Sequence, residues 1–175
     1  MLDVDVLFLW VSFMRALCLC LGLVIWSVTA QAASPDDKGL LCTNQTVADE
    51  GGANIDRVIA EKFFAVWFEQ GAALRTVWRR QNDTIVIHSV SAGSRYRTNS
   101  RAIDWTSKTL VDGQTRENNY IVDRQSLALN ISSTISALAY ECELIETKRS
   151  YDDALDDTRQ TLQAAYDKEL ATNKL

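Results

Sequence analysis

The sequence predicts a mainly β protein: a small antiparallel β-barrel or sandwich with one disulfide and a C-terminal α-helix. Three observations lead to this fold class. Short segments of alternating apolar and polar residues recur about every ten residues between positions 39 and 144, as in small antiparallel β domains. Two cysteines, Cys42 and Cys142, lie near the two ends of that region. From Ser150 onward the alternation stops, and the apolar residues take a helical spacing.

Residues 1–32 have the three parts of a secretory signal peptide. Arg15 supplies a positive charge, an apolar run extends from Ala16 to Val28, and the segment ends in the small residues of Ala30-Gln31-Ala32. This order predicts cleavage after residue 32 and a mature protein that is periplasmic or secreted.

The residues before Arg15 fit a signal peptide less well, because Asp3 and Asp5 give the extreme N-terminus a negative charge. We therefore interpret Met14 as the start of the exported chain. The alternative is an uncleaved membrane anchor over residues 4–30, which is long enough to span a bilayer. That anchor would place Arg15 within the membrane, where a charge is costly. Contact with a membrane is expected only if the segment is retained.

Cleavage would leave two of the four cysteines, Cys42 and Cys142. An even number of cysteines in an exported chain indicates a disulfide. The bridge would close a loop of about 100 residues, for which the chain-entropy model gives a stabilisation of up to about 4.7 kcal/mol. The alternative is a pair of buried free thiols.

The mature chain begins with a polar leader at 33–38, followed by a first strand at 39–45 and an acidic loop at 47–54. The loop carries Gly51-Gly52, which favours irregular structure.

The segment from Ile55 to Arg80 can be interpreted in two ways. Its apolar residues can be drawn on one face of a helix, but Phe63–Phe68 is rich in aromatic and β-branched residues, which favour strands. Glu69–Ala72 makes a suitable turn. We favour a hairpin preceded by one helical turn at 55–60, although short apolar runs leave Ile55–Gln70 open between helix and strand.

Short strands separated by turn residues continue to Leu144. The expected strands are 84–90, 95–98, 102–106, one that carries Leu127, Leu129 and Ile131, and one at 138–144. The expected connections are a turn at 91–94, a polar loop at 111–118 that contains Asp112-Gly113, and a turn at Asp123–Ser126.

The pattern of residues 150–175 predicts a C-terminal helix. Residues 33–149 are then expected to form the β domain. Ser150, with Asp152 and Asp153 close behind, suits a helix N-terminus. The apolar stripe is thin and consists of Tyr151, Leu155, Leu162, Tyr166 and Leu170. We interpret it as a solvated helix that rests on the barrel or extends from it; the alternative is a short coiled-coil contact.

Charge excludes one class of partner. Loss of residues 1–32 would remove one of 18 basic and two of 23 acidic residues, which leaves 17 against 21. The basic residues form no clustered run, so nucleic acid is not an expected partner. A basic middle from Arg75 to Arg124 and an acidic stretch from Glu141 to Asp157 suggest complementary surfaces. We expect a protein partner in the cell envelope.

No motif for catalysis, metal binding or cofactor binding is present. His88 is the only histidine and lies in an apolar strand, and base catalysis needs a positioned partner. There is no nucleophile elbow, phosphate loop or dinucleotide fingerprint. The four acidic residues within Asp152–Asp157 lack the spacing of a calcium loop. The sequence therefore predicts neither an enzyme, nor a metal, nor a cofactor.

Two charged features accompany the strands: Asp123-Arg124 in a turn, and Asp104 beside Trp105. Exposed pairs of this kind are common and weak. We interpret them as charge pairing at the rim of the barrel, with ligand contact as the alternative.

Gly93-Ser-Arg-Tyr96 and Ile103-Asp-Trp105-Thr-Ser-Lys108 resemble the Gly-x-x-Tyr and Trp-x-Lys-Gly elements of bacterial periplasmic inhibitors of c-type lysozyme. Those proteins are small single-domain β-barrels with a disulfide. This chain departs from them at Ala92, where that family has a serine, and after Lys108, where no glycine follows.

The resemblance implies a protein contact through the loop before the tyrosine, which inserts into the lysozyme cleft in that family. The candidate contact residues are Ser91, Gly93, Ser94, Arg95, Tyr96 and Trp105. Arginine and aromatic side chains are also the usual anchors of binding surfaces.

These observations predict an exported, non-enzymatic binding or structural protein of the cell envelope. One alternative is a proteinaceous inhibitor of c-type lysozyme. The other is a carrier of a small apolar ligand held inside the barrel.

Overall fold

The computed structural model describes residues 33–47, 55–90, 93–111, 113–134 and 136–172. The chain divides into two units, Met1–Gln31 and Ala32–Leu175, and all described residues belong to the second. The expected signal peptide therefore lies outside the described residues, as does most of the expected loop at 47–54. Within the described ranges, no helix is long and apolar enough to cross a membrane.

The described elements follow one another in chain order as β1 (Lys38–Thr43), α2 (Ile55–Glu61), β2 (Phe63–Glu69), β3 (Ala72–Gln81), β4 (Thr84–Ser89), β5 (Ser94–Thr98), β6 (Ala102–Val111), β7 (Gln114–Asp123), β8 (Ala128–Ser133), β9 (Ala137–Ile145) and α3 (Lys148–Thr172).

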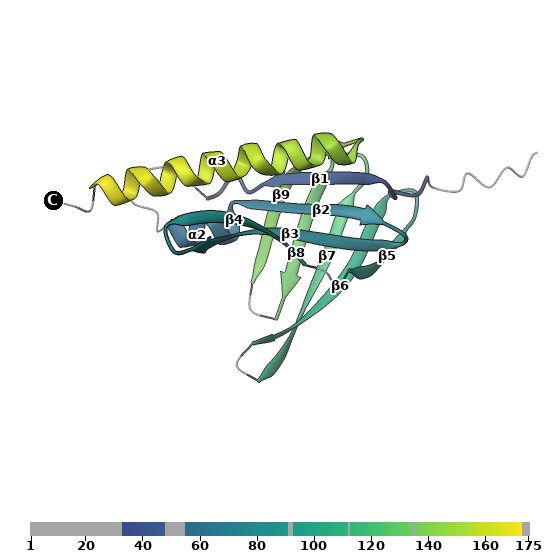
Figure 1. The fold of residues 1–175 in the computed structure, drawn as a ribbon. Coiled ribbons are helices and arrows are strands. Elements are labelled where there is room, and N and C mark those ends of the chain that lie inside the picture. Colours follow the sequence, from purple (N-terminus) through teal and green to yellow (C-terminus); the bar gives the residue numbers. More distant parts are fainter. Residues whose placement is uncertain (1–32, 48–54, 91–92, 112, 135, 173–175) are drawn as a thin grey trace, which may run out of the picture. The chain divides into compact units, whose positions relative to one another are not determined.

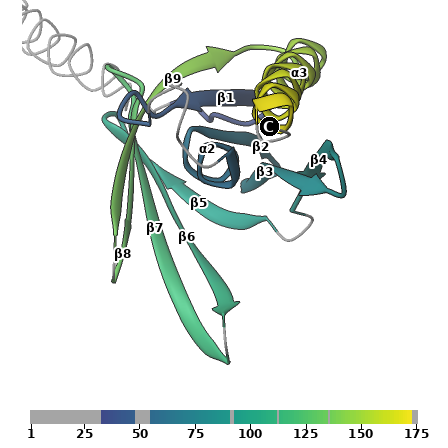
Figure 2. The same ribbon diagram turned by 90° about the vertical axis from the view of Figure 1, so that its left-hand side faces the viewer.

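Eight of the strands form a closed antiparallel barrel, as Figures 1 and 2 show. The order of hydrogen-bonded neighbours is β2-β1-β9-β8-β7-β6-β5-β3, and pairing between β2 and β3 closes the circle. The remaining strand, β4, pairs with β3 alone. Every pairing is antiparallel, and consecutive strands mostly pair as hairpins. The predicted β-barrel is confirmed.

Barrel closure depends on a short ladder between β3 and β5. Only Ala72 with Arg95 and Ala73 with Ser94 are paired there. Beyond Ala73, the same edge of β3 pairs with β4 from Thr76 to Gln81. Along one edge, β3 thus pairs first with β5 and then with β4.

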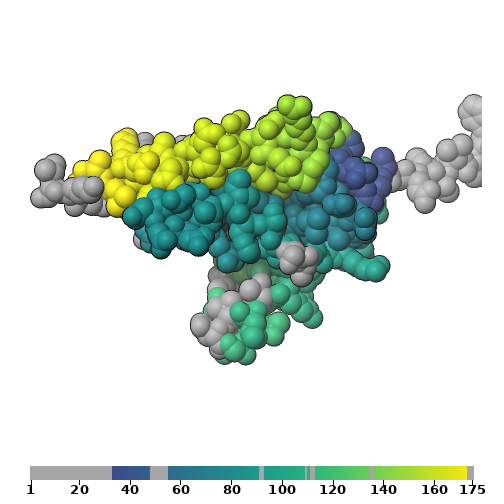
Figure 3. All heavy atoms as spheres, viewed as in Figure 1, coloured from purple at the N-terminus to yellow at the C-terminus, as the bar shows by residue number. Residues whose placement is uncertain are grey.

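Apolar side chains form two clusters, one inside the barrel and one outside it. The inner cluster includes Leu40, Phe64, Phe68, Trp105, Tyr120 and Tyr140. The outer cluster lies between α2, α3 and the outer face of β2–β4, and includes Trp67, Trp78, Ile85, Tyr151, Leu155 and Leu162. In Figure 3, the yellow-green residues of α3 lie along the top of the teal residues, which include β2–β4.

Strand β2 explains why residues 55–80 are ambiguous in sequence. Phe64, Val66 and Phe68 belong to the inner cluster, whereas Ala65 and Trp67 belong to the outer one. A strand that is buried on both faces has a continuous apolar run rather than an alternating one. The favoured interpretation, a helical turn followed by a hairpin, is confirmed by α2, β2 and β3.

The prediction of a polar loop at 111–118 is wrong. Strand β6 continues to Val111 and β7 begins at Gln114, which pairs with Val111. Gly113 has a φ of 75°, as two-residue hairpin turns require; Asp112 lies outside the described residues. Neighbouring strands pair only with residues 103–105 and 118–122, so the end of the hairpin projects from the barrel (Figure 1). Water on both faces explains its polar composition.

The predicted disulfide is confirmed. Cys42 on β1 and Cys142 on β9 are directly paired across the ladder, and their sulfur atoms are bonded. Cys42 is completely buried, so the bridge is part of the inner core.

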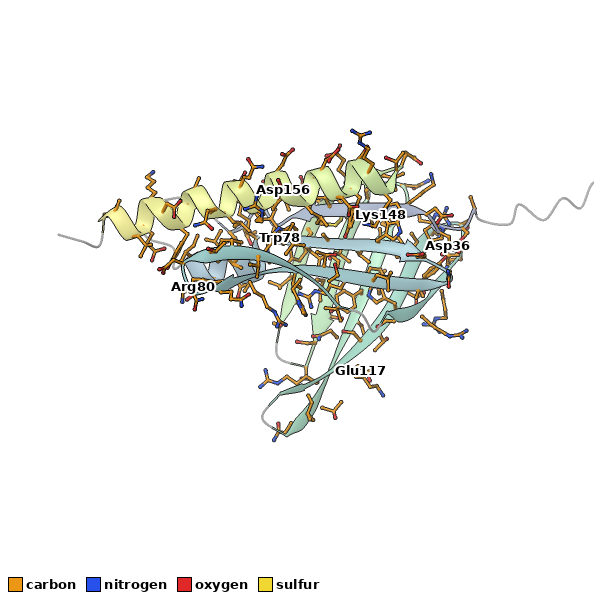
Figure 4. The ribbon with its side chains drawn as sticks, in the orientation of Figure 1. Asp36, Trp78, Arg80, Glu117, Lys148 and Asp156 are labelled. Atoms are coloured by element: carbon orange, nitrogen blue, oxygen red, sulfur yellow. A yellow bond between two sulfur atoms is a disulfide. The ribbon has the colours of Figure 1, made fainter. Side chains whose placement is uncertain are left out.

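Helix α3 rests on the barrel, as one of the two interpretations expected, but it begins at Lys148 instead of Ser150. The amide of Ser150 donates to Thr147 Oγ1 at 3.2 Å, so Thr147 takes the capping role expected of Ser150. Trp78 Nε1 donates to the carbonyl oxygen of Leu155 at 3.2 Å, and Trp78 lies beneath α3 in Figure 4. The helix is therefore held by polar as well as apolar contacts.

Candidate functional site

Residues Ala33–Asp37, called the leader segment below, lie at one end of the barrel beside the β2–β3 turn. The amide of Asp37 donates to the carbonyl oxygen of Phe68 at 2.8 Å. Arg124 Nη2 donates to the carbonyl oxygen of Ala33 at 3.0 Å. Pro35, between them, is buried. The leader segment is thus fixed at both of its ends.

Asp36 connects the leader segment to two parts of the barrel (Figure 4). Its Oδ1 accepts hydrogen bonds from the amide of Gly71 at 3.0 Å and from the hydroxyl of Tyr96 at 2.8 Å. Ser34 Oγ lies 2.9 Å from the same hydroxyl. Gly71 has a φ of 75°, a conformation that glycine adopts without strain. The hydrogen bond from Gly71, and after it the one from Tyr96, hold the pKa of Asp36 below its ordinary value.

We predict that acid releases the leader segment. A carboxyl whose pKa is lower in the folded than in the unfolded chain stabilises the fold above its unfolded value of about 3.9, and this contribution is lost as the pH falls through the folded pKa. The amide chemical shift of Gly71, followed by NMR from pH 6 to pH 2, should titrate with a midpoint below about 3.9.

The Asp36→Asn variant is the matched control, because its amide oxygen can still accept both hydrogen bonds but cannot titrate. Its Gly71 shift should not follow that titration. The same pH profile in wild type and Asp36→Asn, or a wild-type midpoint at or above the ordinary value, would contradict the role given to Asp36.

A pocket of about 170 Å³ lies between the leader segment and the inner core. Its walls are apolar and comprise Leu40, Phe68, Ile103, Val122, Leu127 and Leu144. Ala33, Ser34 and Pro35 of the leader segment line it as well. We call this space the leader pocket. The leader pocket is lined by residues from five strands, from the β7–β8 turn and from the leader segment.

Charged groups also line the leader pocket: Lys38, Arg124 and Glu146. Lys38 Nζ forms an ion pair with Glu146. Arg124 donates from Nη1 to Thr98 Oγ1 at 2.9 Å and to the carbonyl oxygen of Asn99 at 3.1 Å. These contacts fix the cations within the protein, so the walls available to a ligand are mainly hydrocarbon.

The candidate contact residues of β5 lie near this end of the barrel. Gly93 and Arg95 are exposed and Ser94 is half-buried. Ser91 lies outside the described residues. The backbone of Ser94 and Arg95 forms the short ladder with β3, so these residues have a structural part in barrel closure.

The two aromatic candidates, Tyr96 and Trp105, face inward. Tyr96 packs edge-on against Phe68 with ring centroids 5.3 Å apart, and its hydroxyl bonds to the leader segment. Trp105 is 5% exposed and is stacked on Tyr120 with centroids 4.9 Å apart. The structure thus brings Tyr96 to the leader segment and places Trp105 in the inner core.

The charged features of the sequence have local partners. Asp104 pairs with Arg97 at 2.6 Å. Asp123 Oδ1 accepts from the amides of Ser126 and Gln125, which lower its pKa and fix the predicted turn. Asp123 and Arg124 do not pair with one another in the described structure, since Arg124 bonds to Thr98, Asn99 and Ala33.

No described group of three or more His, Cys, Asp or Glu side chains could hold a metal ion. His88 lies on β4, the apolar strand in which the sequence places it, and is exposed there. On α3, Asp152 pairs with Lys148 and Asp156 with Arg159. The side-chain hydrogen bond from Arg159 lowers the pKa of Asp156. These acidic residues have the surface role that the sequence suggests.

Sequence reasoning missed the leader segment as part of a site. Ser34, Pro35 and Asp36 read as a polar tail, because nothing in their local pattern shows that they cover the end of a barrel. Asp36 followed by Asp37, with the chain's only proline before them, favours a turn. A turn signal indicates that these residues are ordered, but it does not show which part of the barrel they contact.

No family model, curated protein or solved structure matches this chain.

Proposed function

We propose that this protein is an exported, non-enzymatic binding protein of the cell envelope that holds a small apolar molecule in the leader pocket. The observation that carries the proposal is the pocket itself, which has apolar walls and reaches the inner core. Small-molecule sites are typically concave, mostly apolar and bounded by a few polar groups.

The size of the pocket limits the ligand. An engineered apolar cavity of about 150 Å³ in another protein stays dry and binds benzene. At about 170 Å³, the leader pocket suits a molecule of that class, such as a small aromatic or branched hydrocarbon group. A longer ligand would have to extend out of the pocket or displace the leader segment, which is hydrogen-bonded to the barrel at Asp37, Asp36 and Ala33.

Export is supported by the disulfide. Disulfides persist in oxidising compartments and are rare in reducing ones, and Cys42–Cys142 joins two strands of the barrel. The signal peptide expected from the sequence agrees with this. Together they favour the periplasm or the extracellular space as the place where a ligand would be met.

We predict that benzene, used as a probe, stabilises the wild-type protein and that filling the pocket abolishes the effect. A ligand that binds only the folded state raises the free energy of unfolding by about 2.7 kcal/mol at a hundred times its Kd. Val122→Phe places a larger side chain in the pocket, because Val122 is completely buried and lines it. Thermal unfolding at increasing benzene concentration measures the effect.

Ile121→Phe is the matched control, since Ile121 precedes Val122 on the same strand and is 49% exposed. It should respond to benzene as the wild type does. The proposal fails if benzene does not raise the wild-type Tm, or if Val122→Phe and Ile121→Phe respond equally. If Val122→Phe does not fold, native mass spectrometry of wild-type protein with benzene decides, and the absence of a one-to-one complex rejects the proposal.

A further inference from the structure

Arg75 points into the barrel from the middle of β3. Ala73 belongs to the inner cluster, whereas Leu74 and Trp78 contact the outer one, so residues 73, 75 and 77 share the inward face. The Arg75 guanidinium carbon lies 5.2 Å from the centroid of the Phe64 ring. Phe64 in turn packs against Tyr120 and Tyr140, at 5.6 and 6.0 Å between centroids. A permanent cation thus sits beside the aromatic part of the inner core.

No carboxylate among the described residues pairs with this guanidinium. Its Nε is enclosed and has no hydrogen-bond partner. The two terminal nitrogens of Arg75, Nη1 and Nη2, also make no hydrogen bond with described residues. Unlike Nε, they are not fully enclosed by protein atoms. Arginine cannot discharge itself by losing a proton at physiological pH. Arg75 as a whole is half-buried, but its enclosed Nε is an unsatisfied polar atom beside the core and calls for an explanation.

The aromatic contact alone is a partial explanation. A guanidinium over a phenyl ring gains cation–π attraction, but the ring supplies no acceptor for the five N–H groups of arginine. Because Nε is enclosed and the terminal nitrogens are not, an acceptor can reach the guanidinium only at its terminal nitrogens. This edge is the part of arginine that binds carboxylate and phosphate groups in a bidentate manner.

Tyr140 provides a second polar group within electrostatic range of Arg75. It is buried, and burial raises its pKa, while the charge of Arg75 acts in the opposite direction. Its hydroxyl is therefore neutral at physiological pH, so it can donate a hydrogen bond. Among the described residues, no hydrogen bond involves this hydroxyl. Glu61 is also within electrostatic range of Tyr140, but Glu61 forms an ion pair with Arg57.

The surface that leads to Arg75 is basic. Arg79 follows Arg75 on the same face of β3, and His88 on β4 is paired with Val77, which lies between them. Paired residues on neighbouring strands project from the same face. Strands β3 and β4 contain no acidic residue. A face of this composition attracts anions and guides them towards the interior.

We propose that Arg75 is the anchor of an anion-binding site that takes the carboxylate or phosphate group of a small molecule. The terminal edge of Arg75 holds two oxygens of the anion, and Tyr140 donates a further hydrogen bond. The leader pocket lies at the Phe68 end of β2, whereas Arg75 contacts Phe64. The anion site is therefore separate from the leader pocket and does not depend on the function proposed for it.

The test uses the mature protein with sodium phosphate or sodium acetate as the probe, and sodium chloride at equal ionic strength as the reference. Thermal unfolding at pH 7 is measured at increasing probe concentration. In wild type, at least one of the two probes should raise the Tm in a saturable manner beyond the chloride reference. A response to phosphate alone identifies a phosphate site, and a response to acetate alone or to both identifies a carboxylate-accepting site.

Arg75→Met removes the charge and retains an apolar side chain of similar length. It should weaken binding of the effective probe at least about tenfold, as expected for loss of charged hydrogen bonds. Arg101→Met is the matched control, because Arg101 is exposed between β5 and β6 and does not lie on the basic face of β3 and β4, and it should bind as wild type does. Without a probe, Arg75→Met should be about as stable as wild type, because it removes the enclosed Nε that has no hydrogen-bond partner and keeps an apolar side chain against Phe64.

The proposal is rejected if neither probe exceeds the chloride reference in wild type, or if Arg75→Met keeps the wild-type response. If Arg75→Met does not fold, Arg75→Lys replaces it. Lysine keeps the charge but not the planar edge, so an unchanged affinity in Arg75→Lys would also reject a bidentate site. A benzene response that survives in Arg75→Met would show that the two sites are independent.

Discussion

Replacement of both Cys42 and Cys142 by alanine is expected to lower the free energy of unfolding by up to about 4.7 kcal/mol, which is the chain-entropy value for a loop of this size. The two cysteines are 100 residues apart in sequence, so the bridge restricts more than half of the chain when it is unfolded. Equilibrium unfolding in urea measures the change. A loss of this size is comparable with a large part of the total stability of a typical domain.

Reduced wild type is the control for the disulfide prediction. Unfolding in the presence of a reductant removes the bond but keeps both side chains, so it separates the effect of the cross-link from that of the substitutions. The reduced protein and the Cys42→Ala, Cys142→Ala variant should lose similar amounts. If oxidised and reduced wild type unfold at the same urea concentration, the bridge does not contribute to stability as expected.

Tyr151→Ala is expected to lower the free energy of unfolding by about 3–5 kcal/mol, as large aromatic deletions in cores do. Tyr151 is 1% exposed, and its ring lies 5.3 Å from that of Trp67. It fills the space above Gly39, where a Cβ atom would collide with its ring. The truncation would leave a cavity between α3 and the barrel. Urea unfolding monitored by tryptophan fluorescence measures the loss.

Tyr151→Phe is the matched control, because it retains the ring and removes only the hydroxyl, which bonds to Thr76 Oγ1 at 3.3 Å. Its expected cost is about 1 kcal/mol, the usual net value of one hydrogen bond. The two variants together separate packing from hydrogen bonding. A cost for Tyr151→Ala close to that of Tyr151→Phe would mean that α3 adds little to the stability of the barrel.

Several parts of the fold could be predicted from sequence because their signals are local. The alternation of β8 and β9 and the turn at Asp123 follow from side-chain periodicity and turn chemistry. The disulfide followed from the number of cysteines that remain if the expected signal peptide is removed. The polar end of the β6–β7 hairpin could not be distinguished from a loop, because a ribbon with water on both faces loses the apolar half of the strand pattern.

The candidate sites were much less predictable. Periodicity tells which face of a strand Val122 or Phe68 occupies, but not that both approach residue 33 at the same end of a closed barrel. Arg75 has a weak signal in retrospect: it replaces an apolar residue at an inward position between Ala73 and Val77. Without the register of β2 and β3, the inward face of that strand cannot be assigned, and Arg75 reads as an ordinary surface arginine.

The short ladder at β5 has a consequence for local unfolding. Strand β5 is paired at two positions with β3 and at three with β6, so its release breaks fewer pairs than that of any other barrel strand. Local opening begins where the fewest such bonds must break. The hydroxyl of Tyr96, on β5, is bonded to Asp36, which is also bonded to Gly71 next to β3. The leader segment thus joins the two strands at the least paired position of the barrel, so local opening between β3 and β5 also requires release of the leader segment.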